Sequence, residues 1–268
     1  MNIHPTAVVE SGAELGAGTS VGPGAFIEAG AKIGADCVIG PHVVIFKYVT
    51  LGPRCRVHAN AVLGDLPQDL AFKNSDESFV RIGADCVIRE GVTIHRGTKP
   101  GTATVVGEHC FLMANSHLGH NVQLGNRVIL VNGVLLAGYV EVGDGAFFGG
   151  GAGIHQFVRI GRLAMLQGMS AISQDVPPFC TTHGTTLNSV AGLNIVGLRR
   201  AGLTPEQRLE IKHAFKLLYC SGLNYRAAVA RIRAELPPGP AHEMADFVTA
   251  SKRGIVGYGG AASGDAAE

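Results

Sequence analysis

The stretch TSVGPGAFIEAGAKIGADCVIG (residues 19–40) repeats one short pattern, and this pattern decides the fold. An aliphatic side chain returns at every sixth position, and a small residue stands two positions before it. The spacing extends from residue 9 to residue 172 with two interruptions. Its positions are Val9, Leu15, Val21, Ile27, Ile33, Ile39, Ile45, Leu51, Val57, Leu63, Ile82, Ile88, Ile94, Val106, Leu112, Leu118, Leu124, Leu130, Leu136, Val142, Phe148, Ile154, Ile160, Leu166 and Ile172. A phase kept over this length marks an internal structural repeat.

A period of six matches neither the 3.6-residue turn of an α-helix nor the two-residue alternation of a long strand. It suits very short strands separated by tight turns, where glycine accepts backbone angles that other residues resist. Three such units close one triangular coil, and stacked coils bury the aliphatic and small side chains. The sequence therefore predicts a mainly β fold, a parallel β-helix of hexapeptide repeats.

The composition limits the functions open to the chain. Glycine accounts for 38 of 268 residues without the three-residue period of collagen, and 46% of the residues are hydrophobic, too many for a disordered chain. The net charge of +1 gives no reason to expect nucleic-acid binding, and no apolar stretch approaches the ~20 residues of a membrane span. The N-terminus has neither region of a secretory signal, so we expect a cytoplasmic protein without membrane insertion.

Four cysteines fall in the small position of the repeat, two residues before an aliphatic one. They are Cys37, Cys55, Cys86 and Cys110. We expect them to be buried thiols of the core rather than metal ligands or disulfides, because the sequence contains no CxxC pair.

Two segments interrupt the repeat, and the C-terminal part of the chain abandons it. We expect a β-helix over residues 1–190, with residues 64–79 and 95–105 leaving it as protruding loops that carry function. A helical domain is expected over residues 191–256. Its first helix should begin at Thr204-Pro205, followed by helices near 225–236 and 241–252. The Gly- and Ala-rich residues 257–268 are expected to be disordered.

The predicted helices are strongly basic. Residues 199–233 carry eight Lys or Arg and two acidic residues. This segment is either an ordinary solvated helix face or a docking surface for an acidic partner.

Residues eighteen apart stack in such a fold, which brings several reactive side chains to one edge. His120, Tyr139 and His155 should follow this edge, with His117 close by. A histidine there could act as a general base on a hydroxyl or an amine. Alternatively, His95, His117 and His120 could hold zinc at a subunit interface, as in the γ-class carbonic anhydrases.

An ordered set of short strings carries a family resemblance over residues 3–256. The strings are GDLPQDL (64–70), IHRG (94–97), NSHLGH (115–120), LAG (136–138), HQF (155–157), QDVPP (174–178) and KLLY (216–219). Together they resemble the acyl-[acyl-carrier-protein]–UDP-N-acetylglucosamine O-acyltransferase family of lipid A biosynthesis. The resemblance implies a left-handed β-helix and a homotrimer with sites between subunits. It also implies transfer of a 3-hydroxyacyl chain from the acidic acyl carrier protein to the glucosamine 3-hydroxyl, without metal or other cofactor.

The resemblance also implies roles for single residues. His120 matches the general base, and Gly138 matches the position whose N–H stabilises the oxyanion. The substrate-binding positions are matched by Asp69, His117, Asn121, Tyr139, His155, Gln156, Gly168, Asn194 and Arg200. Within this set, Asp69 and His117 belong to the sugar, Arg200 to the diphosphate, and Gly168 to the end of the acyl groove.

The chain departs from the family at several of these positions. The family has Asp where this chain has Asn121 and His where it has Tyr139, and Ala71, Val196 and Ala201 replace a Lys, an acidic residue and an Arg. A carboxylate would favour the imidazolium, whereas an amide can only orient the ring. Two alternatives therefore stay open, N-acylation of a 3-amino analogue of the sugar nucleotide and a scaffold without catalytic activity.

Overall fold

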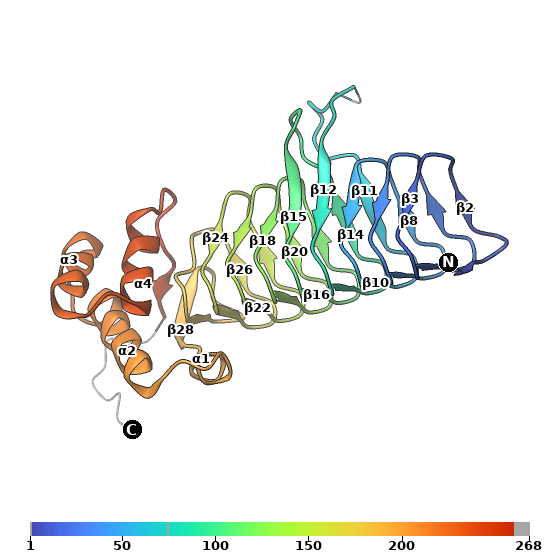
Figure 1. The fold of residues 1–268 in the computed structure, drawn as a ribbon. Coiled ribbons are helices and arrows are strands. Elements are labelled where there is room, and N and C mark those ends of the chain that lie inside the picture. Colours follow the sequence, from blue (N-terminus) through green and yellow to red (C-terminus); the bar gives the residue numbers. More distant parts are fainter. Residues whose placement is uncertain (1, 74, 260–268) are drawn as a thin grey trace.

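The computed structural model describes residues 2–73 and 75–259, which form a long three-sided prism of short strands with helices at one end (Figure 1). Each side is one sheet, and the chain visits the three sheets in turn. Sheet A contains β1 (Asn2–Ile3), β4 (Ser20–Val21), β7 (Val38–Ile39), β10 (Arg56–Val57), β13 (Val87–Ile88), β16 (Phe111–Leu112), β19 (Ile129–Leu130), β22 (Phe147–Phe148), β25 (Met165–Leu166), β27 (Cys180–Thr182), β28 (Ser189–Leu193) and β29 (Gly257–Tyr258). Sheet B contains β2 (Val8–Val9), β5 (Phe26–Ile27), β8 (Val44–Ile45), β11 (Val62–Asp65), β14 (Thr93–His95), β17 (His117–Leu118), β20 (Leu135–Leu136), β23 (Gly153–Ile154) and β26 (Ala171–Ile172). Sheet C contains β3 (Glu14–Leu15), β6 (Lys32–Ile33), β9 (Val49–Leu51), β12 (Phe79–Ile82), β15 (Ala103–Val106), β18 (Gln123–Leu124), β21 (Glu141–Val142) and β24 (Arg159–Ile160).

The strands of successive coils pair in parallel and in register. In sheet B, Leu118 lies opposite Leu136, and Leu136 lies opposite Ile154, so residues eighteen apart stack as predicted. From Val21 to Ile172, every aliphatic or aromatic residue of the six-residue repeat is at most 5% exposed. Burying each such side chain stabilises the fold by about 1.5–3 kcal/mol. The fold class predicted from the repeat, a parallel β-helix followed by helices, is confirmed.

The cysteines of the repeat lie inside the prism, as predicted. Cys37, Cys55, Cys86 and Cys110 are buried free thiols. Each thiol donates to a backbone carbonyl of the following coil, as Cys37 Sγ does to Gly52 O at 3.2 Å. They fill the narrow position that alanine occupies in other coils.

Both segments that break the repeat leave the prism at the corner between sheets B and C (Figure 1). Residues 66–78 join β11 to β12, and residues 96–102 join β14 to β15. Their bases continue the sheet further than the sequence predicted, because Phe79 pairs with Ala103. Gly101 N also donates to Glu77 O at 2.8 Å, so the two loops support each other above this corner.

Four helices follow the prism: α1 (Ile195–Arg200), α2 (Pro205–Tyr219), α3 (Tyr225–Glu235) and α4 (Pro240–Thr249). The predicted start of α2 is correct, because Thr204 and Gln207 form a reciprocal capping box. The six-residue α1 was not predicted. Helix α4 ends before the predicted residue 252, because Ser251 Oγ turns back to donate to Asp175 Oδ2 of the prism at 2.8 Å. Among the residues described, no helix combines the length and apolar character that crossing a bilayer requires.

The prediction of disorder from residue 257 is wrong for the first of these residues. Gly257 and Tyr258 form β29, which pairs in parallel with β28. The Tyr258 ring packs edge-on against Phe215 of α2, with ring centroids 5.5 Å apart. This aromatic contact anchors a segment whose composition alone suggests disorder. The rest of the predicted tail, residues 260–268, lies outside the described residues.

Candidate active site

The predicted histidine edge is the corner between sheets B and C, below the two loops. We call it the B–C corner and define it by the stacked turns 119–122, 137–140 and 155–158. His120, Gly138 and Gln156 occupy the same position in these three turns, because each lies two residues after one of the stacked inward residues. The register therefore places His120, Tyr139 and His155 at one corner, as the sequence predicted.

The imidazole of His120 is half-buried, and only one of its two ring nitrogens has a hydrogen-bond partner among the described residues. Its Nδ1 lies 3.2 Å from Oδ1 of Asn121, a residue that is only 6% exposed. The ring also meets Tyr139 edge-on, with centroids 5.2 Å apart. No hydrogen bond within the described residues uses Nε2 of His120. This nitrogen is therefore available to a substrate proton.

Gly138 packs closely against this imidazole. A Cβ at this position would collide with the ring of His120, which explains why the turn needs glycine here. Gly138 is buried, yet no hydrogen bond found in the described part of the chain uses its N–H. A free backbone donor thus lies beside a free imidazole nitrogen, which is the arrangement that acyl transfer requires for a base and an oxyanion donor.

A groove of about 820 Å³ begins at these two residues and follows the outer face of sheet B. Its lining residues are Gln68, His95, His117, Gly119, His120, Leu135, Leu136, Ala137, Gly138, Gly153, Ile154, His155, Gln156, Ala171, Ile172, Ser173 and Leu187. Polar side chains gather at the B–C corner, whereas Leu135, Gly153 and Ala171 form an apolar floor, of which Gly153 and Ala171 have little or no side chain. The groove therefore suits a ligand with a polar head and an apolar chain.

His117 lines the groove as a neutral imidazole. Its Nδ1 lies 2.7 Å from Oγ1 of Thr93, and its ring is 5.1 Å from that of His95. Burial and the nearby His95 lower the pKa of His117 to about 4. It can therefore exchange hydrogen bonds with a sugar hydroxyl near neutral pH without carrying charge.

The zinc alternative finds no support in this geometry. The Nδ1 atoms of His95, His117 and His120 contact three separate partners, Leu66 O, Thr93 Oγ1 and Asn121 Oδ1. Within the described residues no group of three or more His, Cys, Asp or Glu side chains is placed to hold a metal ion.

His155 and Gln156 are exposed and line the groove one coil beyond Gly138, toward the helical end of the molecule. Arg253, which the sequence analysis missed, reaches this part of the groove from the segment after α4. Its Nη2 lies 3.4 Å from His155 Nδ1, and its Nε donates to Ser173 O at 3.1 Å. The six-residue repeat could not predict this contact, because Arg253 lies about eighty residues after the repeat ends.

Three further predicted residues lie near the groove without lining it. Asp69 is exposed on the first loop, where its Oδ1 accepts from Ala71 N at 2.9 Å, and its neighbour Gln68 lines the groove instead. Asn121 and Tyr139 stand behind His120. Both contact Thr98, which lies in the second predicted loop and had no role assigned from the sequence.

The remaining predicted residues lie at the other two corners of the prism. Gly168 is in the turn from β25 to β26, between sheets A and B. Asn194 caps α1 and donates to Leu163 O at 2.9 Å, in the turn between sheets C and A. Arg200 is exposed at the end of α1. None of the three is among the residues that line the groove.

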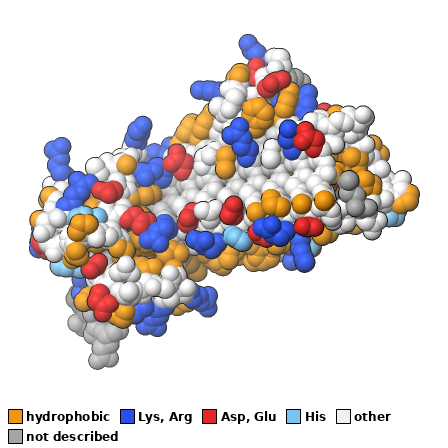
Figure 2. Space-filling model, in the orientation of Figure 1, with side chains coloured by type: hydrophobic (Ala, Val, Ile, Leu, Met, Phe, Trp, Pro, Cys, Tyr) orange, Lys and Arg blue, Asp and Glu red, His pale blue; other side chains and the backbone are white. Residues whose placement is uncertain are grey.

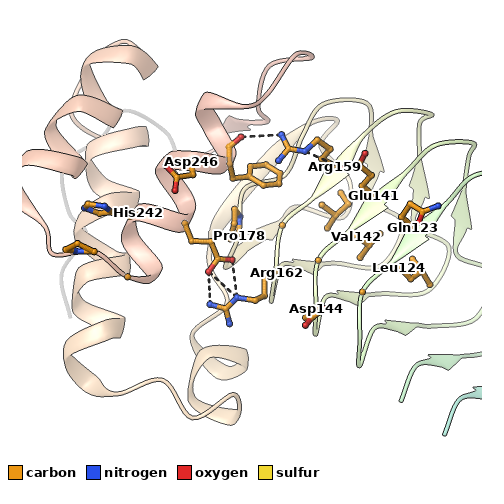
Figure 3. A pocket seen from close by; sticks show the side chains of 18 residues that line it. Gln123, Leu124, Glu141, Val142, Asp144, Arg159, Arg162, Pro178, His242 and Asp246 are labelled. Atoms are coloured by element: carbon orange, nitrogen blue, oxygen red, sulfur yellow. Dashed lines mark hydrogen bonds and ion pairs between the residues drawn. The ribbon is translucent and has the colours of Figure 1, made fainter. Parts of the chain in front are cut away.

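A larger groove of about 1150 Å³ separates sheet C from α4 (Figure 3). Its arginines already have partners. Arg162 donates to both carboxylate oxygens of Glu243, at 2.8 Å for the shortest contact. Arg159 lies over the ring of Phe247, 4.2 Å from its centroid, and 3.7 Å from Asp175 Oδ2. These contacts hold the helices against the prism, so the groove is structural rather than reactive.

Comparisons with known proteins match about 95% of the chain. The family described as "Udp N-acetylglucosamine O-acyltransferase; Domain 2" matches residues 175–256, and the "Bacterial transferase hexapeptide (six repeats)" family matches residues 12–47, 30–65 and 103–138. An acyl-[acyl-carrier-protein]–UDP-N-acetylglucosamine O-acyltransferase of Anaeromyxobacter sp. (strain K) is 43% identical over 258 residues, which cover 95% of this chain and 99% of that protein. The protein of the same name from Burkholderia lata is 44% identical over 260 residues, covering 95% of this chain and 98% of the relative.

Solved structures agree with the sequence relatives. The UDP-N-acetylglucosamine acyltransferase from Campylobacter jejuni superposes with a TM-score of 0.90 at 38% identity, covering 96% of this chain and all of that one. The corresponding acyltransferase from Bacteroides fragilis gives a TM-score of 0.91 at 34% identity, covering 94% and 99%.

Proposed function

The chain belongs to the acyl-[acyl-carrier-protein]–UDP-N-acetylglucosamine O-acyltransferase family, and we propose how its B–C corner carries out the transfer. The enzyme moves an acyl group from acyl carrier protein to a hydroxyl of UDP-N-acetylglucosamine, the first step of lipid A biosynthesis. The observation that carries the mechanism is the pair formed by the free Nε2 of His120 and the free N–H of Gly138, at the head of a groove with an apolar floor.

In the proposed reaction, Nε2 of His120 takes the proton of the glucosamine 3-hydroxyl. The oxygen attacks the thioester carbonyl of the 3-hydroxyacyl carrier, and the N–H of Gly138 donates to the oxyanion that forms. Collapse of this intermediate breaks the C–S bond. The imidazolium then returns its proton to the departing thiolate, so the histidine ends as it began. The apolar floor of Leu135, Gly153 and Ala171 receives the acyl chain.

In this proposal His117 and Gln156, which both line the groove, hold the sugar and nucleotide portions of the acceptor. The neutral His117 offers its Nε2 to a sugar hydroxyl while Nδ1 stays on Thr93. His155 and the neighbouring Arg253 present a donor-rich end to the groove, which suits a diphosphate. None of the proposed steps uses a metal or other cofactor, so full activity after chelation is the expected result.

We also propose that three copies close into a ring, because two faces of the prism are apolar and one is polar. Outward side chains of sheet A include Val38, Val87, Phe111, Ile129, Phe147 and Met165, with the polar Ser20 and Arg56 nearer its N-terminal end, and those of sheet B include Val8, Phe26, Val44, Val62 and Leu135. Those of sheet C include Glu14, Lys32, Arg81, Gln123, Glu141 and Arg159. A cyclic trimer covers two faces of each copy and leaves the third to water.

A trimer also accounts for the predicted residues that miss the groove. Asn194 and Arg200 lie near the corner between sheets C and A of their own chain, away from His120. A neighbouring copy in a ring can present this corner to the groove, where Arg200 would meet the diphosphate. We propose the same for Asp69, which stands exposed on the first loop.

The helical end of the molecule offers the docking surface for acyl carrier protein. Lys and Arg side chains are spread over this end in Figure 2. Arg231 and Arg233 are paired with Glu235 and Asp246, whereas Lys212 and Lys216 of α2 are exposed and have no ion pair among the described residues. These two lysines border a hollow of about 540 Å³. We propose this face of α2 as the surface that receives the acidic carrier.

Turnover of defined substrates tests the proposed function. The purified protein is incubated with 3-hydroxyacyl carrier protein and either UDP-N-acetylglucosamine or its 3-amino analogue, and the products are separated by mass. We expect an O-acylated product at the higher rate, as the names of the relatives indicate. Preference for the amine would support the N-acylation alternative, and no product with either acceptor would support a scaffold. Cytoplasmic location stays a prediction that cell fractionation can test.

A further inference from the structure

A chain of hydrogen bonds runs from the second loop to the catalytic imidazole. Both the backbone N and Oγ1 of Thr98 lie 3.0 Å from Asn121 Oδ1. The same Thr98 hydroxyl lies 2.9 Å from the hydroxyl of Tyr139, and the same Asn121 oxygen lies 3.2 Å from Nδ1 of His120. Asn121 N donates to the buried Thr104 Oγ1 at 2.8 Å, which fixes the backbone of this turn.

One backbone group determines which atom is the donor in each of these hydrogen bonds. The N–H of Thr98 can only donate, so the side-chain atom of Asn121 that faces it must be the amide oxygen. That oxygen can only accept, so Nδ1 of His120 carries the proton and Nε2 is the unprotonated nitrogen. The single hydroxyl proton of Thr98 goes to the same oxygen. The bond between Thr98 and Tyr139 is therefore donated by Tyr139.

The hydrogen bonds from Thr98 to Asn121 matter because the two ends of an amide differ: one is an acceptor and the other a donor. If the side chain of Asn121 turned over, its NH₂ group would face Nδ1 of His120 and stabilise the tautomer protonated at Nε2. That tautomer cannot accept the substrate proton. A carboxylate at this position presents an oxygen in either orientation, so it needs no such constraint. This chain carries Asn121 where the resemblance implies Asp, and the donors of Thr98 supply the constraint that an amide needs.

We propose that Thr98 is a positioning residue, which keeps His120 in its basic tautomer by holding the amide oxygen of Asn121 toward Nδ1. Tyr139 supports it by occupying the acceptor side of the Thr98 hydroxyl. The second loop thus has a role in the reaction although none of its side chains needs to touch the substrate. This inference rests on the proposed function, because it assumes that His120 is the base.

Substitution of Thr98 tests the inference. Thr98→Val keeps the shape and the backbone N–H but removes the hydroxyl, so we expect kcat to fall about three- to tenfold, the usual weight of one hydrogen bond. The KM for UDP-N-acetylglucosamine should stay within about twofold, because no substrate contact is lost. Thr98→Ser should restore kcat. Thr50→Val, on an exposed strand position of sheet C, is the matched control and should leave kcat unchanged.

The decisive arm combines Thr98→Val with Asn121→Asp. The symmetric carboxylate removes the need for orientation, so in this background the valine should cost less than about twofold. An equal loss in both backgrounds, or a rise in KM with kcat unchanged, would overturn the inference. His120→Ala separates it from the proposed function. If that variant is inactive while Thr98→Val behaves as wild type, only the role of Thr98 falls.

Discussion

Adding one methyl group to Gly138 should disable the enzyme without removing any functional group. The Cβ of Gly138→Ala would collide with the imidazole of His120, so the ring must rotate away from the turn. Rotation also breaks the 3.2 Å contact between His120 Nδ1 and Asn121 Oδ1. The N–H of residue 138 stays in place, so the substitution tests the packing of the base rather than the oxyanion donor.

The expected size of the effect follows from this collision. A misplacement of about 1 Å at a reacting group can cost about 100-fold in rate, so we expect kcat to fall by roughly that factor. Overpacking of this kind destabilises a fold by about 1–3 kcal/mol, which thermal unfolding would detect. The KM for the acyl carrier should change little, because the docking surface proposed for it on α2 is elsewhere.

Gly150→Ala is the matched control for this prediction. Gly150 lies two residues after the inward Phe148, the same turn position as Gly138, but at the corner between sheets A and B. Its Cβ would meet Asn132 O at 3.4 Å and Val131 Cγ1 at 3.6 Å, which are ordinary contacts. Initial rates of acyl transfer should therefore match wild type. Retention of activity within threefold by Gly138→Ala, or an equal loss in Gly150→Ala, would refute the reasoning.

Three other predictions follow from charge, burial and assembly. The pKa of His117 is about 4 in the folded protein and near 6.5 when unfolded, so between these pH values the unfolded state binds more protons than the folded state. The free energy of unfolding should therefore decrease by about 1–2 kcal/mol from pH 6.5 to pH 4. Denaturant unfolding should show a smaller decrease for His117→Asn. An equal dependence of the unfolding free energy on pH in both proteins would contradict the neutral buried imidazole. Lys212→Glu should raise the KM for acyl carrier protein several-fold and leave the KM for the sugar nucleotide unchanged, whereas Lys32→Glu should change neither KM. Equal effects of the two substitutions would contradict the proposed docking surface. His120→Ala and Arg200→Ala should each be inactive on their own. When equal amounts of the two variants are unfolded and refolded together, the mixture should regain about one quarter of wild-type activity. In the proposed cyclic trimer, one quarter of the interfaces between copies then combine an intact His120 from one copy with an intact Arg200 from the next. No recovery would place both residues in the same chain's site.

The repeat made the prism and the location of the histidines predictable. Each coil buries side chains at the same positions, so the register of Leu118 against Leu136 and Ile154 follows from their spacing alone. The same logic placed the thiols of Cys37 and Cys55 inside the core. A repeat this regular leaves almost no freedom in how its corners stack.

The repeat does not predict the conformation of the two loops or of the C-terminal residues. The contact from Thr98 to Asn121 joins a loop to a turn, and no periodicity specifies where a loop folds back. The six residues of α1 are too few for a helical pattern, and a side-chain cap from Asn194 supports them. The strand at Tyr258 depends on its contact with Phe215, which composition does not reveal.

Only part of the predicted substrate site lies around His120 in the described chain. Sequence reasoning grouped Arg200 and Asn194 with His120, but the fold puts them near different corners of the prism. Spacing fixes the corner on which a residue lies. How copies meet depends on the shape and polarity of whole faces, which become visible only once the strands are in place.

The rate of His120→Ala tests the central claim most directly, provided that its mass in solution equals that of the wild type, whose chain is 27.8 kDa. With acyl carrier thioester and UDP-N-acetylglucosamine both saturating, kcat should fall by about 10²–10⁴-fold, the contribution of a positioned general base. A variant that keeps its activity within tenfold of wild type would show that another group removes the proton.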